Sequence, residues 1–92
     1  MSVMVRIPTP LRRMTNGKDK VEVESANLSE LVEKLNGKFP GFKDRLVDEE
    51  GELRYFVNIY LNGEDVRFMD GLNTSTNEGD EISIVPAVAG GF

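Results

Sequence analysis

The chain contains no cysteine and no histidine among its 92 residues. The absence of cysteine excludes disulfides, thiol nucleophiles and thiolate metal ligands. The absence of histidine removes the side chain that titrates near neutral pH and serves as the usual base in serine and cysteine catalysis. The remaining carboxylates form no pair on a regular element that would suit acid–base chemistry. We therefore expect a protein that is not an enzyme and that binds no metal or cofactor of its own.

Long apolar runs and an excess of positive charge are missing as well. No segment approaches the length of a membrane span, and the N-terminal region lacks the apolar core of a signal peptide. The net charge of −5 disfavours nucleic acid and anionic membranes as partners and favours a partner protein with a basic docking surface. These absences predict a cytoplasmic protein that acts through other proteins.

The residues that are present suit one folded domain. Hydrophobic residues make up 39% and charged residues 29% of the chain, which is typical of a folded domain and not of a disordered chain. Alternating apolar and polar residues predict half-buried strands at four places, and a short return strand follows the third of them. The predicted strands are residues 2–7, 20–24, 55–61 and 81–85, and the return strand is residues 64–68.

One main helix is predicted between the second and third strands. Its apolar residues share a single stripe with i, i+3, i+4, i+7 spacing. They are Leu28, Leu31, Val32 and Leu35. Asn27 is a good N-cap, Glu30 stands where a capping box needs it, and Gly37 is expected to end the helix in a left-handed conformation. We predict a helix over residues 28–36 that crosses one face of the sheet.

The segment after this helix is predicted to close the core. Phe42, Leu46 and Val47 suit a short helical turn, and residues 48–52 form an acidic loop. A cation site is one interpretation of the loop and a solvated surface loop is the other. The spacing lacks the alternating oxygens of a calcium loop, which favours the solvated loop.

The predicted order of strand, strand, helix, strand, strand, strand is typical of an α+β fold. An initial hairpin, a crossing helix and a mixed sheet of about five strands, with the first and last strands as central neighbours, describe the ubiquitin-like β-grasp. A ferredoxin-like sandwich is the alternative that periodicity alone leaves open. That fold needs a second full helix, which residues 39–54 supply poorly.

The C-terminal segment is not typical of packed globular structure. Pro86 is expected to block strand pairing, and Gly90-Gly91 is the most flexible dipeptide available. Two residues without Cβ let a backbone enter a slot that is too narrow for a side chain. We predict a domain over residues 1–86 and a flexible tail over residues 87–92 that enters such a slot on a partner.

The β-grasp pattern together with this tail resembles the ThiS/MoaD family of ubiquitin-like sulfur carrier proteins. Within the family, the chain resembles the CysO-like subgroup, which serves cysteine or homocysteine biosynthesis. Residues 56–68 are similar to the central hairpin of that subgroup, and residues 79–91 are similar to its C-terminal segment. A bare Gly-Gly is weak evidence, whereas Gly-Gly in register with a Gly-Asp turn, an apolar strand and a Pro-Ala-Val-Ala run is specific.

The resemblance implies that Gly91 is the working residue and that Gly90 gives it access to a partner. An E1-like adenylating enzyme would activate the Gly91 carboxylate with ATP and magnesium. Sulfide or a persulfide would then replace AMP and leave a thiocarboxylate. A sulfhydrylase-type acceptor enzyme would use this sulfur to make cysteine, or homocysteine for methionine. A carrier for molybdopterin, thiamine or tRNA thiolation and a ubiquitin-like protein modifier are the alternatives.

One residue departs from the family's pattern. In most members the second glycine is the C-terminus, whereas here Phe92 follows Gly91. The resemblance implies a precursor from which a JAMM-type zinc peptidase removes Phe92, so that the processing site is the bond between Gly91 and Phe92. The alternative is a protein that no longer reacts.

Docking on the partner is expected on the sheet face that the helix leaves uncovered. Phe56, Tyr60 and Phe68 are candidate aromatic anchors, and Pro86 and Val88 are candidates beside the tail. The alternative is that the three aromatic side chains fill the core or cover an edge of the sheet. The free protein is expected to be a monomer.

Overall fold

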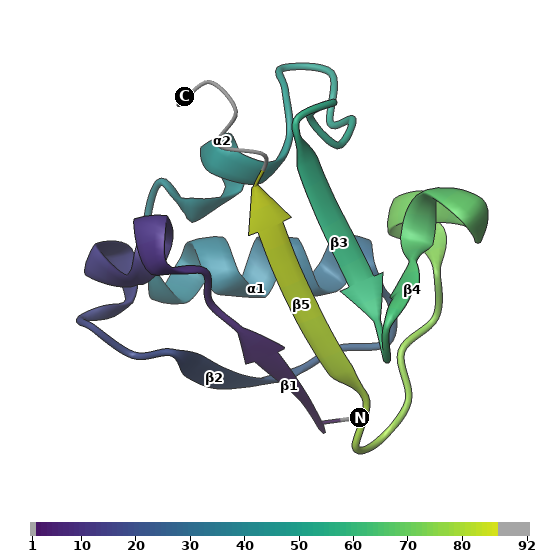
Figure 1. The fold of residues 1–92 in the computed structure, drawn as a ribbon, viewed down its shortest axis with the longest axis horizontal. Helices are drawn as coiled ribbons and strands as arrows, with labels where there is room; N and C mark the ends of the chain where they lie inside the picture. Colours follow the sequence, from purple (N-terminus) through teal and green to yellow (C-terminus); the bar gives the residue numbers. More distant parts are fainter. Residues whose placement is uncertain (1, 87–92) are drawn as a thin grey trace.

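In the computed structural model, which describes residues 2–86, five strands form one sheet and the longer helices pack on one of its faces (Figure 1). The strands are β1 (Ser2–Arg6), β2 (Lys20–Glu24), β3 (Val57–Leu61), β4 (Glu64–Asp65) and β5 (Glu81–Pro86). The helices are α1 (Leu28–Lys38) and α2 (Phe42–Leu46), and the short 3-10 helices are η1 (Thr9–Thr15), η2 (Val66–Phe68) and η3 (Gly71–Asn73).

The strand order β2-β1-β5-β3-β4 places the first and last strands side by side at the centre of the sheet. β1 and β5 run parallel, with Val5 opposite Ile82, and the other neighbouring strands run antiparallel. A mixed five-stranded sheet crossed by one main helix confirms the predicted ubiquitin-like β-grasp.

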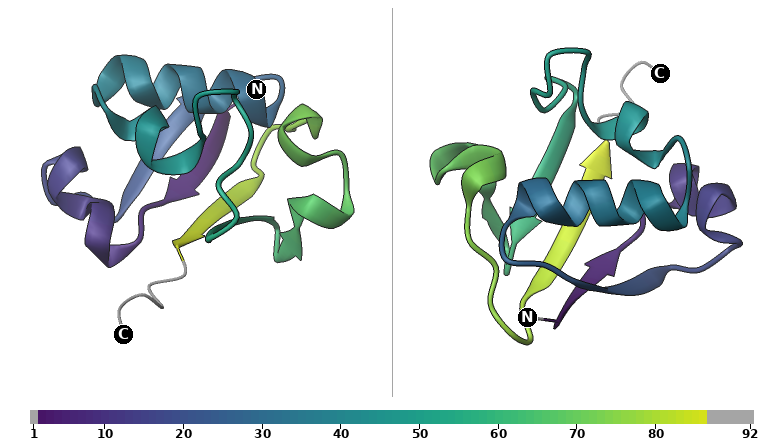
Figure 2. Two further views of the ribbon diagram at one scale, coloured as in Figure 1. Left: turned by 90° about the horizontal axis from the view of Figure 1, so that it is seen from above. Right: turned by 180° about the vertical axis from the view of Figure 1, so that it is seen from behind.

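The core lies between the sheet and α1 (Figure 2). Strand alternation sends every second side chain to this side, as predicted. The buried strand residues are Val3, Val5, Val21, Val23, Val57, Ile59, Leu61, Ile82 and Ile84. The four residues of the predicted apolar stripe of α1 are buried, and Phe42 and Leu46 of α2 close one end of the core. Burial of each such side chain contributes about 1.5–3 kcal/mol.

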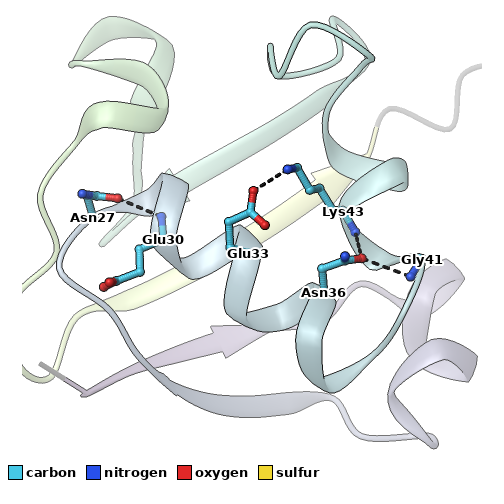
Figure 3. A network of polar contacts seen from close by, with 6 residues as sticks. All are labelled: Asn27, Glu30, Glu33, Asn36, Gly41 and Lys43. Carbon is cyan, nitrogen blue, oxygen red and sulfur yellow. Dashed lines mark hydrogen bonds and ion pairs between the residues drawn. The ribbon is translucent and has the colours of Figure 1, made fainter.

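The N-terminus of α1 carries the predicted cap (Figure 3). The Glu30 N–H donates to Asn27 Oδ1 at 2.8 Å. Glu30 Oε1 in turn accepts a hydrogen bond from the Ala26 N–H at 2.6 Å, so this capping box closes one residue earlier than the usual pattern. These bonds satisfy backbone donors at the helix start and fix where α1 begins.

A second side-chain cap joins α1 to α2 (Figure 3). Asn36 Oδ1 accepts hydrogen bonds from the N–H groups of Gly41 and Lys43, at 3.0 and 3.1 Å. Lys43 also forms an ion pair with Glu33 of α1. Gly41 has φ of +94°, a left-handed conformation that favours glycine. The short helix α2 is therefore held in place by α1, where it covers the end of the core.

The predicted role of Gly37 is wrong. α1 continues through Lys38, and Phe39 is its C-cap with φ of −131°. Gly37 lies inside the helix with an ordinary helical backbone, and a Cβ added there would meet no atom within 4 Å. The Phe39 N–H donates to Leu35 O at 2.8 Å, so the last turn closes without a left-handed residue.

Residues 9–15 form η1, which the sequence analysis did not predict. This helix buries Leu11 and Thr15 against the domain. Their burial stabilises a helix that is too short to be stable by itself. The predicted tight turn follows at Asn16 and Gly17, which have φ of 58° and 84°.

Two predicted strands are shorter than expected by at least two residues. β3 begins at Val57 instead of residue 55, because Tyr55 stands clear of the sheet with 90% of its surface exposed. The return strand ends at Asp65, whose Oδ1 accepts a hydrogen bond from the Arg67 N–H at 2.9 Å. That local bond turns the chain into η2, because short polar side chains compete with strand pairing for backbone donors.

The expectation that Pro86 blocks pairing is also corrected. β5 includes Pro86, which lies opposite Val57 of β3. The Asn62 N–H donates to Glu81 O at 2.8 Å, and hydrogen-bonded positions recur at every second residue of an antiparallel pair. Pro86 therefore occupies a non-hydrogen-bonded position toward β3, where its missing N–H costs nothing.

Candidate functional site

The end of β5 is the point from which the predicted working tail continues. Pro86 is half-buried at this end. The predicted site residues Val88, Gly90, Gly91 and Phe92 lie outside the described residues, and their assignments stay predictions. The described surroundings of Pro86 are therefore the part of the site whose geometry can be given.

Within residues 2–86, no helix covers the face of the sheet opposite α1 (Figure 1). The strand registers place Arg6, Ser83 and Tyr60 side by side across β1, β5 and β3. Val85 and Asn58 form the next row toward the end of β5. We call the side chains of this uncovered side the open face; it is mixed in character, unlike the uniformly apolar covered face.

Exposed apolar side chains gather near the end of β5. Val85 and Phe56 are 43% and 39% exposed, and Phe56 directly precedes the β3 residue that lies opposite Pro86. Tyr55 packs edge-on against Phe56, with ring centroids 5.4 Å apart. Large exposed apolar groups next to one another are typical of a protein–protein contact.

The structure separates the three predicted aromatic anchors. Phe56 lies near the end of β5, and Tyr60 is half-buried on the open face opposite Ser83. Phe68 belongs to η2, beyond the edge strand β4, and is 90% exposed. Phe56 and Phe68 therefore do not fill the core. Their role in docking stays a prediction.

Arg67 connects η2 to the open face, and the sequence analysis did not predict it as a residue of the site. Its guanidinium donates through Nη1 to Asn58 Oδ1 and through Nη2 to Arg54 O, both at 2.6 Å. These bonds hold η2 against the start of β3, next to Phe56. The sequence held one local signal for the turn that places Arg67, which is the Asp65-x-Arg67 spacing. An Asp side chain often accepts a hydrogen bond from the backbone N–H two residues further along the chain.

A groove runs along the edge of β5 that faces the end of β1. Its volume is about 390 Å³ and its walls are β5, the end of β1 and the start of η1. The lining residues include Pro8, Pro10, Val85 and Pro86 and two arginines, Arg6 and Arg12. Sequence reasoning missed this groove because it did not predict η1, which forms one wall.

Charge on the open face is partly paired. Arg6 Nε lies 2.9 Å from Glu81 Oε2, and both side chains are about half exposed. An ion pair in such a position contributes on the order of 0.2–1 kcal/mol, so it orients Arg6 more than it stabilises the fold.

Residues 2–86 bring together no group of three acidic side chains that could hold a metal ion. None of the helices in that same range is long and apolar enough to cross a membrane.

The chain belongs to the ThiS family, whose model matches residues 5–91. This match covers nearly the whole β-grasp domain and runs through Gly91. Within the family, the chain is similar to proteins named CysO.

The sulfur carrier protein CysO of Mycobacterium tuberculosis is 45% identical over 93 residues, covering 99% of this chain and all of that protein. The small archaeal modifier protein 3 of Haloferax volcanii is 35% identical over 68 residues, covering 74% of this chain and 73% of that protein. A crystal structure of the BexX/CysO complex of Amycolatopsis orientalis contains a chain that superposes with a TM-score of 0.89 at 44% identity, covering 92% of this chain and 94% of that one. This fold is therefore found in a complex with a partner protein.

Proposed function

We propose that this protein is a sulfur carrier that acts in the biosynthesis of a sulfur-containing amino acid, cysteine or homocysteine. The observation that carries the proposal is the family match, which extends through Gly91 and so includes the Gly-Gly that follows β5. The 45% identity to a protein named sulfur carrier CysO, over nearly the full length of both chains, supports the amino-acid branch. The carrier works in the cytoplasm, dilute and monomeric, and is not itself an enzyme.

The chemistry takes place on the Gly91 carboxylate and is performed by a partner. In an E1-like enzyme, a carboxylate oxygen attacks the α-phosphate of ATP, pyrophosphate leaves with the help of magnesium, and an acyl adenylate forms. Sulfide then attacks the acyl carbon and AMP leaves, which gives the thiocarboxylate directly. A persulfide in the same role gives an acyl disulfide, and a thiol must then cleave its S–S bond, forming a new disulfide, to release the thiocarboxylate. Activation is needed because a carboxylate oxygen is a poor leaving group. A sulfhydrylase-type acceptor enzyme then takes up the sulfur.

Phe92 must be removed before Gly91 can react. In the chain as given, the Gly91 carbonyl is part of the peptide bond to Phe92. Hydrolysis of that bond by a JAMM-type zinc peptidase would release the carboxylate. Gly90 and Gly91 together suit a narrow channel, because neither residue carries a Cβ.

Docking uses the open face around the end of β5. Phe56 and Val85 offer apolar area there, Tyr60 offers an aromatic side chain in the adjoining row, and Pro86 lines the groove beside them. Residues 87–91 span about 16–18 Å when extended, which is enough to place Gly91 in a buried site while the domain stays outside. Val88 would lie in the channel, and Phe68 would contribute to a contact on the η2 side.

The second candidate function is that of a protein modifier. The similarity to a small archaeal modifier protein favours it, since such a modifier would use the same glycine terminus. In this role an activated Gly91 would be joined to lysine side chains of target proteins.

Intact-mass measurement tests the proposal. The chain ending at Gly91 is incubated with the adenylating enzyme, ATP, magnesium and a sulfide source. Replacement of one oxygen by sulfur is the expected mass change. The chain that retains Phe92 serves as the matched control and is expected to remain unchanged until the peptidase is added.

Gly91→Ala in the chain ending at residue 91 is expected to fold normally and to lose sulfur loading, because a Cβ does not fit the channel. Normal loading of this variant would disprove the narrow-channel argument. Isopeptide-linked ladders in cells, without a thiocarboxylate form, would instead support the modifier.

A further inference from the structure

The two edges of the sheet differ in how they are protected. β4 is only Glu64–Asp65, and the chain turns directly into η2 after it. β2 spans Lys20–Glu24, and among residues 2–86 the views from the front and from behind show no element beyond it (Figures 1 and 2). A longer, uncovered edge strand offers backbone donors and acceptors to another strand.

The backbone groups of β2 that point away from β1 belong to three alternate residues. The Ile7 N–H donates to Asp19 O at 2.8 Å, and β1 and β2 pair with Val5 opposite Val21. Hydrogen-bonded positions therefore fall on the odd-numbered residues of β2. The N–H and C=O groups of the even-numbered residues, Lys20, Glu22 and Glu24, point away from β1.

The charges along this edge are self-complementary. Lys18 and Lys20 are followed, at the same spacing, by Glu22 and Glu24. If two copies of β2 pair antiparallel about Val21, each Lys20 lies opposite a Glu22 and each Lys18 lies opposite a Glu24. Opposite charges at such cross-strand positions attract, and a centre at Glu22 or Val23 would instead place two glutamates opposite each other. One register is therefore favoured.

A groove beside β2 suits the same register. It has a volume of about 730 Å³ and lies between β2 and α1, where Glu33, Lys34, Gly37 and Lys38 form its helical wall. The Glu33 carboxylate is already paired with Lys43. Strand alternation puts Asp19 on the same side as Val21, so that Asp19 of the second copy would lie opposite Val23, near Lys34 and Lys38. The missing Gly37 side chain leaves this space open.

We propose that two copies of this chain associate through antiparallel pairing of β2 about Val21, forming one continuous sheet. In this register Lys20 and Glu22 of opposite copies exchange both backbone hydrogen bonds. The Lys38 ammonium, which now donates to Glu22 O at 3.4 Å, gives way to the Lys20 N–H of the second copy.

The dimer leaves the proposed docking region free. The end of β5 lies two strands away from the pairing edge. The open face and the surroundings of Pro86 therefore stay accessible in each copy. The short pairing edge predicts weak, reversible association, as for interfaces at the low end of the size range, so the protein is monomeric when dilute and dimeric when concentrated.

Sedimentation equilibrium of the full chain from micromolar to about millimolar concentration, at low salt, tests the proposal. The wild type is expected to shift from monomer to dimer, and added salt is expected to weaken the association. Lys20→Glu and Glu22→Lys are each expected to weaken self-association at least about tenfold, because each variant places like charges opposite each other.

An equimolar mixture of the two variants is the decisive sample. The glutamate introduced at position 20 of one variant would then face the lysine introduced at position 22 of the other. Every cross-strand pair is then opposite in charge, and association is expected to return. Glu64→Lys, at the other edge, makes the same change in net charge as Glu22→Lys and is expected to leave the wild-type association intact. Circular dichroism confirms that each variant is folded.

Three results would overturn the proposal. The first is a wild-type protein that stays monomeric at about millimolar concentration. In that case the β2 edge would be available to pair with a strand of another protein. The second is a mixture of the two variants that does not associate. The third is an equal loss of association in Glu64→Lys, which would mean that net charge and not the β2 register controls it.

Discussion

The two sides of β5 differ sharply although they belong to the same six residues. Ile82 and Ile84 face α1 and are almost fully buried, whereas Ser83 and Val85 face the open side and Val85 is 43% exposed. The covered side determines how stable the domain is. The open side is available for contacts with a partner, so adjacent residues of one strand are under different physical constraints.

Ile84→Ala is the substitution with the largest expected effect on this comparison. Removing a buried isoleucine side chain leaves a cavity and is expected to lower the free energy of unfolding by about 2–5 kcal/mol. Urea unfolding followed by circular dichroism measures this loss. Sulfur loading of the fraction that remains folded is expected to be unchanged, and a loading defect in that fraction would mean that the two sides are not separable.

Val85→Ala is the matched change on the open side. We expect the free energy of unfolding to change by less than about 1 kcal/mol, because the side chain is already partly in water. Affinity for the adenylating enzyme is expected to fall about tenfold, as for an apolar residue near the centre of an interface. Calorimetric titration of the two proteins measures the affinity. Normal binding by this variant would contradict the proposed docking at the end of β5.

Asn27→Ala tests a residue that contributes to stability without core burial. Loss of the bond from the Glu30 N–H to Asn27 Oδ1 is expected to cost about 1 kcal/mol in unfolding free energy. Thermal unfolding measures the change, and Asn27→Ser, which keeps a capping oxygen, is the control. If the two variants were equally destabilised, the cap would not be the cause.

Alternation and the α1 stripe were sufficient to predict where four strands and the main helix lie and which of their residues are buried. These signals depend only on which side of an element faces the interior, and the sequence carries that information directly. Pairing of β1 with β5 spans most of the chain, and periodicity left two folds open until the C-terminal motif favoured one of them.

The parts that could not be predicted depend on contacts between distant or irregular segments. η1 begins after Pro8, contains Pro10 and has no clear apolar period, so nothing local predicted it or the groove beside β5. Gly37 was expected to end α1, but the hydrogen bond from the Phe39 N–H to Leu35 O extends the helix. Arg67 reaches Asn58 and Arg54 O only because β3 and η2 come together in space.

The pairing at the end of β5 has a consequence for how information passes through the molecule. Pro86 has no N–H, and the N–H of its neighbour across the sheet, Val57, is already bonded to Arg54 O at 2.9 Å. The ladder between β3 and β5 therefore ends on a pair without a backbone hydrogen bond between its two strands. We expect the proposed chemistry at Gly91 to leave the stability of the domain unchanged, so that partner enzymes would distinguish precursor, free acid and thiocarboxylate at the terminus itself.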